Sequence, residues 1–306
     1  MALRRGGVLE AASREAGVSV RGIGRVMGEF DLVQGWLYAG SAAASILASG
    51  RTPVVWNMRH VLSDQRESAT TRASLSLMRN VLHARACVVN SSAAMHSNRG
   101  LRTREWVKIS NGVDTGRFRR DAEGGHSLRV ELGISDDILL LLQVARAHPH
   151  KGHELLLEAV ERLRGSRPDL MLALIGEGTT EFTRPGVVGL GARDDVQRCL
   201  NAADIVVNPS LTESAPNAVL EAMSCARPCV VTNVGESADL VADTGWVCEV
   251  SVEGLIEGLA SALAADDEQR DRLGNASRER VMERYAQIAC VDAYEALYRR
   301  LMRECG

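Results

Sequence analysis

The sequence predicts an α/β protein of two domains, and three observations lead to this prediction. The chain has 306 residues, more than one domain usually holds and enough for two. Strand-sized apolar runs alternate with amphipathic helical segments from residue 138 to about Ser237. The charge also changes along the chain: residues 1–125 carry 18 of the 36 Lys and Arg but 10 of the 39 Asp and Glu, leaving 18 and 29 for the remainder. The balances of +8 and −11 indicate two halves with different partners.

The second half predicts a doubly wound parallel sheet. Unbroken apolar runs are typical of strands covered on both faces, and helical periodicity follows most of them. Strands are predicted at 138–145, 170–175, 187–190, 204–208 and 228–232, and helices at 152–164, 194–202, 216–225 and near Ser237. The tail is helical from Val252, and its last segment, 286–303, is long enough to return to the first domain.

The first half predicts a thinner α/β pattern. Strands are expected at 18–22, 31–34, 53–56 and 87–90, and helices at 42–48, 70–83 and 93–99. The Asn-Gly turn at Asn111 and the charged stretch after it indicate a boundary. We therefore predict domains at 1–118 and 119–284, with a C-terminal helical segment at 285–306.

Composition excludes several classes of protein. No apolar run reaches the roughly 18 residues of a transmembrane helix, and Arg4 and Arg5 precede no apolar signal-peptide core. The seven cysteines are scattered, with Cys225 and Cys229 closest, which favours buried thiols of a reducing cytoplasm over disulfides or a metal site. With 4% aromatic residues, the sequence lacks the stacking platforms of a nucleic-acid binder.

The segment Thr212–Met223 predicts an anion site. It follows a predicted strand, and Pro216 stands where proline favours the start of a helix. Backbone amides of the first turn, from Asn217 to about Leu220, suit a diphosphate. Glu213 and Glu221 suit hydroxyl groups instead, because a carboxylate accepts the hydrogen bonds that hydroxyl groups donate. The alternative is a surface helix with incidental acids.

The segment Arg146–Gly152 predicts a phosphate-binding loop. It follows a strand directly and enters a helix, a position where open α/β sheets bind ligands. Arg146 can donate two parallel hydrogen bonds to phosphate oxygens, and Lys151 can contact them as a compact positive charge. Such charges would neutralise a departing nucleoside diphosphate. The alternative is a solvated basic loop.

Three histidines in the same region, His148, His150 and His153, invite a metal interpretation. Neither a cysteine nor a recognisable carboxylate pattern accompanies them, so we predict no metal site.

The segment Gly189–Val196 links a strand to a helix whose N-cap candidate is Asp194. The backbone at Ala192 can meet the edge of a nucleotide base, and Arg193 can stack on it. Alone, this feature is weak.

Taken in order, these segments resemble the donor domain of retaining glycosyltransferases of family 4, which have the GT-B fold of two Rossmann-like domains facing a cleft. The resemblance runs from about Asn111 to Tyr298. Arg146 and Lys151 match the family's phosphate-binding pair, and Glu213 and Glu221 match its E-x7-E pattern. It implies that Arg146, Lys151 and Glu213 are catalytic, with Glu213 on sugar hydroxyls. It also implies donor binding by Ala192, Arg193, Ala215, Pro216, Asn217, Ala218, Val219 and Glu221, the last holding the ribose.

Residues 34–40 and 53–60 are similar to the acceptor domain of a bacterial subgroup that often makes capsular, exopolysaccharide or O-antigen chains. That subgroup often has His where Ala39 stands. The opening segment Val8–Gly17 resembles a later helix of the family, so the resemblance implies a first domain truncated at its N-terminus. Loss of a central first strand would expose strand edges.

The resemblance implies retaining transfer from a UDP- or GDP-sugar to a saccharide or lipid-linked acceptor, without a metal or other cofactor. No residue stands out as an enzymic nucleophile. Arg59 and His60 could contact the sugar or acceptor, or could have a structural role. The basic first half indicates possible peripheral contact with the inner face of the cytoplasmic membrane. Two other functions remain open: a non-catalytic nucleotide-sugar-binding subunit and a nucleotide-sugar 2-epimerase.

Overall fold

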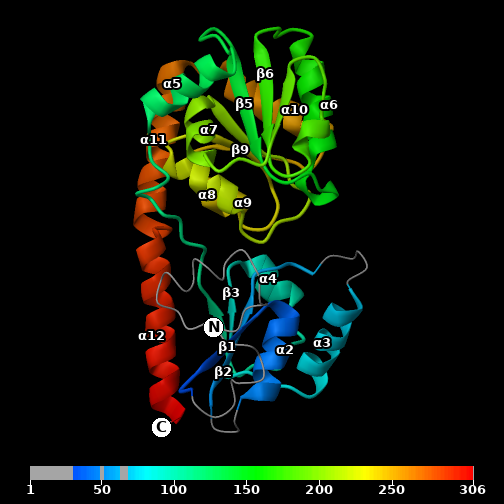
Figure 1. Ribbon diagram of the computed structural model, residues 1–306, viewed down its shortest axis with the longest axis vertical. Helices are drawn as coiled ribbons and strands as arrows, with labels where there is room; N and C mark the ends of the chain where they lie inside the picture. Colours follow the sequence, from blue (N-terminus) through cyan, green and yellow to red (C-terminus); the bar gives the residue numbers. More distant parts are fainter. Residues whose placement is uncertain (1–29, 49–51, 63–67, 306) are drawn as a thin grey trace. The chain divides into compact units, whose positions relative to one another are not determined.

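The computed structural model describes residues 30–48, 52–62 and 68–305, and the chain divides into two compact units (Figure 1). The first unit comprises residues 1–90, 94–109 and 293–306, and the second comprises 91–93 and 110–292. The main division falls at residue 109 instead of the predicted 118, because Val113 and Phe118 are buried in the core of the second unit. The tail divides at 292 instead of 284. The predicted strand at 18–22 and the helix-like segment 8–17 lie outside the described residues.

The second unit contains a six-stranded sheet with the order β10-β9-β8-β5-β6-β7. All neighbouring strands are parallel, which confirms the predicted doubly wound sheet. Its strands are β5 (Leu139–Val144), β6 (Leu170–Ile175), β7 (Val187–Gly191), β8 (Ile205–Asn208), β9 (Cys229–Thr232) and β10 (Trp246–Cys248).

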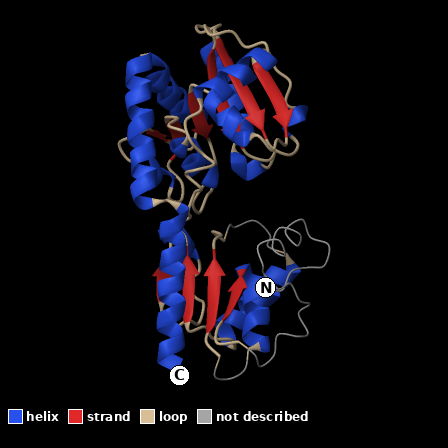
Figure 2. Ribbon diagram, turned by 60° about the vertical axis from the view of Figure 1, so that its left-hand side comes forward, coloured by secondary structure: helices blue, strands red, loops and turns tan. Residues whose placement is uncertain are grey.

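Helices cover both faces of this sheet, as Figure 2 shows. Because side chains alternate along a strand, Leu140 and Leu142 of β5 pack in one apolar core while Leu141 packs in the other. The first core is completed by α5 (Ala122–Glu131), α7 (Val196–Ala202), α8 (Asn217–Ser224), α9 (Ser237–Val241) and α11 (Asp267–Arg284). The second is completed by α6 (His153–Arg164) and α10 (Val252–Ala264). Burial on both faces explains why these strands read as continuous apolar runs.

The described part of the first unit contains a parallel sheet with the order β1-β2-β3-β4. These strands are Val33–Trp36, Val54–Met58, Ala86–Val89 and Trp106–Lys108. Trp56 and Met58 of β2 lie in an apolar core with residues of α2 (Leu37–Leu47), α3 (Ala69–Asn80) and α4 (Ser92–Ser97). Within the described residues this sheet has fewer strands than that of the second unit.

The opposite face of this sheet meets the C-terminal helix α12 (Gln287–Cys305). Trp36 of β1 is the register partner of Asn57 of β2, and the Asn57 side chain donates to the Tyr294 hydroxyl at 2.6 Å. The Tyr298 hydroxyl bonds the Gln34 side chain, two residues before Trp36. Polar side chains in these strands therefore serve the contact with α12.

Three elements were not predicted. Helix α5 falls in the charged stretch assigned to a boundary, β10 follows α9, and β4 is a three-residue strand. Asp121 caps α5 by accepting from the Gly124 amide at 2.9 Å. Gly125 lies against α7, where a Cβ would come within 2.3 Å of the Asn201 carbonyl oxygen. Of the two glycines that hide this helix from sequence reasoning, Gly125 is thus required by the packing of the helix against α7.

The cysteines of the second unit behave as small apolar side chains. Cys225 and Cys229 are free and buried, and burial raises the pKa of each thiol to about 12. Such thiols remain protonated and unreactive at neutral pH.

Candidate functional site

The sheet order of the second unit defines where a ligand would bind. From the adjacent strands β5 and β8, the chain proceeds to β6 and β7 on one side and to β9 and β10 on the other. In open α/β sheets, ligands bind outside the carboxyl ends of the strands at such a reversal. The loops that follow β5 and β8 here are 145–152 and 209–216, the segments that the sequence singled out.

A close backbone approach joins these two loops. Gly152 has φ +67°, and a Cβ there would lie 1.9 Å from the Pro209 carbonyl oxygen. The Leu211 amide also donates to the His150 carbonyl at 2.8 Å. Only glycine fits at position 152, and the contact fixes the adjacent Lys151 at the reversal point.

Lys151 and Glu213 meet across this junction. The Lys151 Nζ lies 2.5 Å from the Glu213 Oε1, and the two side chains are 29% and 11% exposed. The Ser210 hydroxyl, which is fully buried, lies 2.9 Å from the same carboxylate oxygen. The sequence predicted roles for Lys151 and Glu213 in one site, and the structure brings them into contact.

Ser210 is a residue that sequence reasoning missed. Its hydroxyl lies within hydrogen-bond distance of both Glu213 and Asn208, and its carbonyl accepts from the Thr232 hydroxyl at 2.6 Å. Gly235, with φ +57°, supports the same loop because a Cβ there would lie 2.3 Å from the Glu213 carbonyl oxygen. A serine two residues after a buried strand is too common to be a signal by itself.

Arg146 and His148 lie beside Lys151. Arg146 is exposed, and no described residue accepts a hydrogen bond from its guanidinium. Partial desolvation, together with the charges of Arg146, His150 and Lys151, lowers the pKa of His148. A neutral His148 agrees with its Nδ1 accepting from the His150 amide at 3.3 Å. The loop thus keeps two cations and a neutral imidazole.

Helix α8 begins beside this pair. Pro216 precedes its first residue, and no described side chain caps the helix N-terminus. Asn217 is exposed and Ala218 half-buried, whereas the Val219 side chain is in the core, so only its backbone can face a ligand. The first-turn amides can therefore serve an anion.

The Asn111 side chain holds the start of this helix. It donates to the Ala215 carbonyl at 3.0 Å and to the Asn217 side-chain oxygen at 2.7 Å. The sequence alone predicts Asn111 only as a turn residue at a domain boundary.

Glu221 lines a small cavity. The cavity has a volume of about 80 Å³ and is bordered by Gly112, Val113, Asp114, Phe118, Asn217, Leu220 and Glu221. Burial raises the pKa of Glu221 to about 6, although the charge of Arg117 opposes this. A carboxylate held in a partly dry cavity gains from donors such as hydroxyl groups.

The predicted base-binding residues lie after β7. Ala192 is exposed, while the Arg193 guanidinium is held by Asp195 through bonds of 2.7 and 2.8 Å. The predicted N-cap Asp194 is wrong: the residue before α7 is Asp195, and its carboxylate binds Arg193 and Arg198 instead of capping the helix. Arg193 therefore has a fixed plane, and a base would have to stack on a paired guanidinium.

Arg59 and His60 lie in the first unit, after β2. Arg59 donates to the Asn57 side-chain oxygen at 3.1 Å and to the Tyr294 hydroxyl at 2.7 Å. The guanidinium carbon lies 5.4 Å from the centroid of the Trp36 ring and 5.8 Å from that of Tyr294. His60 is exposed, and its carbonyl accepts from Asn98 at 3.2 Å. Arg59 thus has a structural part in this unit, one of the two roles left open by the sequence.

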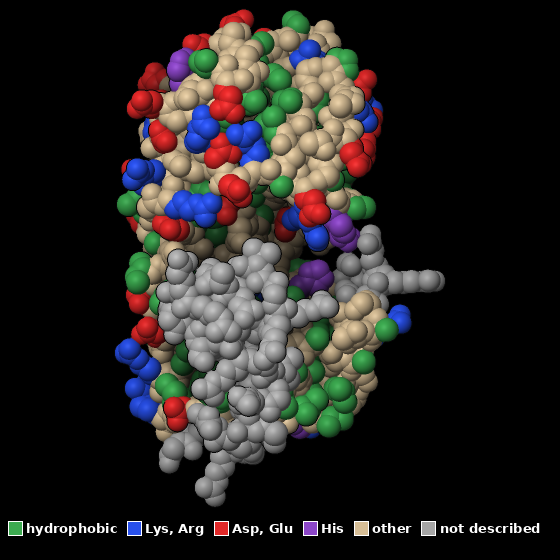
Figure 3. Space-filling model, viewed as in Figure 1, with side chains coloured by type: hydrophobic (Ala, Val, Ile, Leu, Met, Phe, Trp, Pro, Cys, Tyr) green, Lys and Arg blue, Asp and Glu red, His purple; other side chains and the backbone are tan. Residues whose placement is uncertain are grey.

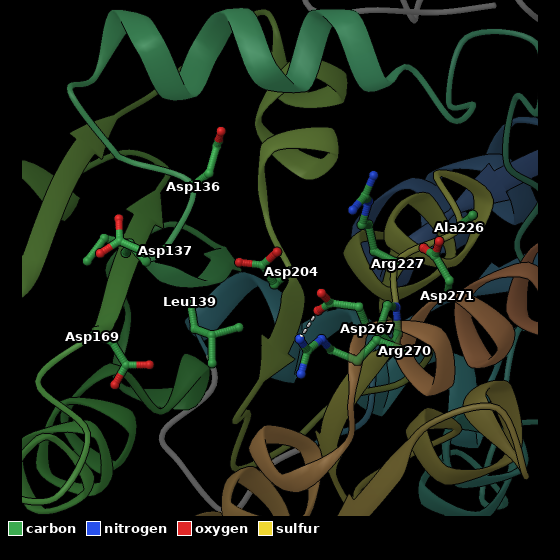
Figure 4. Close-up of a pocket in the computed structure, with 12 residues that line it drawn as sticks. Asp136, Asp137, Leu139, Asp169, Asp204, Ala226, Arg227, Asp267, Arg270 and Asp271 are labelled. Carbon is green, nitrogen blue, oxygen red and sulfur yellow. Dashed lines mark hydrogen bonds and ion pairs between the residues drawn. The ribbon is translucent and has the colours of Figure 1, made fainter.

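A cavity of about 500 Å³ lies at the opposite edge of the second sheet, where its strands begin (Figure 4). Asp136, Asp137, Asp169 and Asp204 border it together with Arg227 and Arg270. It is larger than the cavity at Glu221 but is lined by none of the predicted donor residues. We place the candidate site at the carboxyl edge, because there the sheet reverses and Lys151 meets Glu213.

The visible surface of the second unit carries acidic and basic side chains side by side (Figure 3). The negative balance of this half is therefore not one uniform acidic field on that face.

Among the helices described, none is long and apolar enough to cross a membrane.

Comparison with known proteins finds a family model that matches part of this chain. Residues 139–265 match the family model for glycosyl transferases group 1. This group 1 domain covers the sheet reversal, Arg146, Lys151, Glu213 and Glu221.

Curated relatives extend the match beyond this domain. N-acetyl-alpha-D-glucosaminyl L-malate synthase of Bacillus anthracis is 29% identical over 199 residues, 61% of this chain and 51% of that protein. UDP-Gal:alpha-D-GlcNAc-diphosphoundecaprenol alpha-1,3-galactosyltransferase of Escherichia coli is 27% identical over 206 residues, 62% and 53% of the two chains. The chain spans about half the length of these relatives.

Solved structures cover nearly the whole chain. Anabaena Alr3699/HepE in complex with UDP-glucose has a TM-score of 0.80 at 20% identity, covering 97% of this chain and 90% of that one. Sucrose-phosphate synthase of Thermosynechococcus elongatus has a TM-score of 0.75, also at 20% identity, covering 97% and 77%. The fold is therefore the predicted GT-B fold with two Rossmann-like units.

Proposed function

We propose that the chain is a retaining glycosyltransferase of family 4, which moves a sugar from a nucleoside-diphosphate sugar to a saccharide or lipid-linked acceptor. We place this reaction in the cytoplasm or at the inner face of the cytoplasmic membrane. It would contribute to the synthesis of cell-surface polysaccharide or glycoconjugate. The observation that carries the proposal is the contact of Lys151 with Glu213 at the sheet reversal, inside the matched group 1 domain and beside the start of α8.

Each part of the site suits one part of the donor. Arg146, Lys151 and the first-turn amides of α8 would hold the diphosphate and stabilise it as it leaves. Glu213 would accept from sugar hydroxyls and Glu221 from the ribose. The base would lie between Ala192 and Arg193. Two cations and a helix N-terminus supply the positive charge, so the proposed mechanism needs no metal ion.

The rarity of lysine in this chain supports the role of Lys151. Only two of the 36 cationic residues are lysines, Lys108 and Lys151, and all others are arginines. Lysine offers a compact point charge with three donors, whereas arginine offers a planar fork. Lys151 can therefore contact Glu213 and a phosphate oxygen together.

The two lysines also provide a matched control. We would titrate UDP and GDP by calorimetry into the wild type, Lys151→Ala, Glu221→Ala and Lys108→Ala. We expect one nucleotide to bind, with affinity about 10- to 100-fold weaker in the first two variants and unchanged in Lys108→Ala. Failure of both nucleotides to bind the wild type would overturn the donor site.

Release of nucleotide distinguishes the alternatives. A transferase releases UDP or GDP in proportion to acceptor, an epimerase converts the sugar while it stays nucleotide-bound, and a binding subunit does neither. The anomeric configuration of the product, read by NMR, tests retention.

A further inference from the structure

The carboxyl end of β1 presents two large apolar side chains to solvent. Trp36 is 54% exposed and Leu37 is 48% exposed. They are the last residue of a parallel strand and the first residue of helix α2. An exposed tryptophan offers a ligand one of the largest apolar surfaces that a side chain can provide.

A strained backbone holds these residues in place. Leu37 has φ +55°, a conformation that residues other than glycine adopt rarely. Gly35 is pressed against α2, where a Cβ would come within 2.3 Å of the Ser41 Cα. Because strand and helix touch and no loop residue separates them, the chain must reverse at Leu37. Such strain tends to persist where function requires the geometry.

Polar groups border the Trp36 ring. The Arg59 guanidinium lies over the rings of both Trp36 and Tyr294, and hydrogen bonds to Asn57 and the Tyr294 hydroxyl fix its position. Trp36 thus has a fixed cation over its ring, and the residue as a whole is 54% exposed. This arrangement comes entirely from β1, β2 and α12 within the first unit.

We propose that Trp36 is a stacking platform for a pyranose ring of the acceptor saccharide, with Arg59 as the residue that positions the indole. One face of a pyranose carries several C–H groups, whose partial positive charge suits the negative face of an aromatic ring. Because Arg59 lies over the indole, the pyranose would stack on the ring surface that Arg59 leaves exposed, and the hydroxyl groups of its rim suit this charged surrounding. A lipid tail would gain nothing from the cation. The inference rests on the proposed transferase function, because it names the acceptor of that reaction.

The test uses ligand-observed saturation-transfer NMR on the full chain, with the methyl glycosides of glucose, galactose, mannose, N-acetylglucosamine and rhamnose as probes. We expect at least one glycoside to receive saturation, strongest on the C–H protons of one ring face. In Trp36→Ala the affinity should fall about 10-fold or more, whereas Trp36→Tyr should stay within about 3-fold of the wild type.

Ile46→Ala is the matched control, since Ile46 is a 61% exposed apolar residue on α2 outside the platform. It should leave glycoside binding unchanged. Saturation of no glycoside by the wild type, or equal saturation in Trp36→Ala, would overturn the platform.

Calorimetry with UDP and GDP on the same samples separates this inference from the proposed function. Trp36→Ala should bind nucleotide as the wild type does. If Trp36→Ala loses glycoside binding but keeps nucleotide binding, the platform is supported. If the wild type binds no nucleotide, the proposed donor site is wrong.

Discussion

Replacing Glu221 with glutamine should stabilise the protein while weakening nucleotide binding. Burial raises the pKa of Glu221 from 4.5 to about 6, so its carboxylate form is disfavoured in the folded chain. Each pKa unit is worth about 1.4 kcal/mol, which makes the cost of ionising this buried group roughly 2 kcal/mol. Glutamine has nearly the same shape and no charge, so Glu221→Gln removes that cost.

The sign of the effect follows from proton binding. Between pH 4.5 and about 6 the folded state holds more protons at Glu221 than the unfolded state, so stability falls as pH rises through this window. The contribution is fully present below the lower value and lost above the upper one. We therefore expect Glu221→Gln to raise the free energy of unfolding by about 2 kcal/mol at pH 8 and hardly at all at pH 4.

Urea unfolding, followed by circular dichroism at both pH values, measures this difference. An equal gain at pH 4 and pH 8 would mean that packing, and not charge, is responsible. No gain at pH 8 would mean that the carboxylate is not penalised by burial.

Nucleotide binding should change in the opposite direction. A carboxylate that accepts ribose hydroxyls loses charge-assisted hydrogen bonds in Glu221→Gln, which weakens affinity about 10- to 100-fold. The terminal phosphate of a nucleoside diphosphate also titrates near pH 6 and changes the affinity of both proteins. Glu221→Gln therefore shows the pH dependence that comes from the phosphate alone. Wild-type affinity should fall more steeply than variant affinity as pH drops from 8 to 5. Parallel pH profiles would refute the assignment of Glu221 to the ribose.

Three further changes test the junction of the two loops. Ser210→Ala removes a buried partner of Glu213 and should raise the KM for the donor sugar about 10-fold, with a smaller loss of nucleotide affinity because Glu213 also restrains Lys151; an unchanged KM would contradict a role of Ser210 in positioning Glu213. Gly152→Ala places a methyl group against the Pro209 carbonyl and should destabilise the fold by ~3 kcal/mol or more in urea unfolding, so wild-type stability would disprove the close approach. Lys151→Arg keeps the charge but brings a larger planar group, and kcat should fall about 10-fold or more; unchanged kcat would show that only charge matters.

Periodicity and burial explain why the second unit could be predicted well. Leu139–Val144 is covered on both faces, so it reads as an uninterrupted apolar run and was recognised as a strand. The sheet order then placed the segments of Arg146 and Glu213 on adjacent strands. Their contact follows from topology, which the alternation of strands and helices already implies.

The elements that the sequence does not predict either contain residues that disfavour their structure or are too short to show a periodic pattern. Helix α5 contains Gly124 and Gly125, which weaken a helix, and tertiary packing against α7 overrides that preference. Strands β4 and β10 have three residues each, too few to show a period.

Partners of charged side chains were equally hidden from the sequence. Arg193 is predicted to stack on a base, and the sequence does not show that Asp195, two residues later, binds its guanidinium. Arg59 is positioned by Tyr294, more than 200 residues away in the chain. A sequence gives the type of a side chain, whereas its partner depends on how the elements pack.

The contact between Lys151 and Glu213 makes the two residues one unit in energetic terms. A lysine ammonium has three donors, so the bond to Glu213 leaves capacity for phosphate oxygens. The bond also restrains a flexible four-carbon side chain, which reduces the entropy lost when a diphosphate binds. Arg146 is exposed and lacks such a restraint among the described residues, so it must pay that entropy on binding. Glu213, although proposed to hold the sugar, should therefore also affect affinity for a diphosphate that carries no sugar.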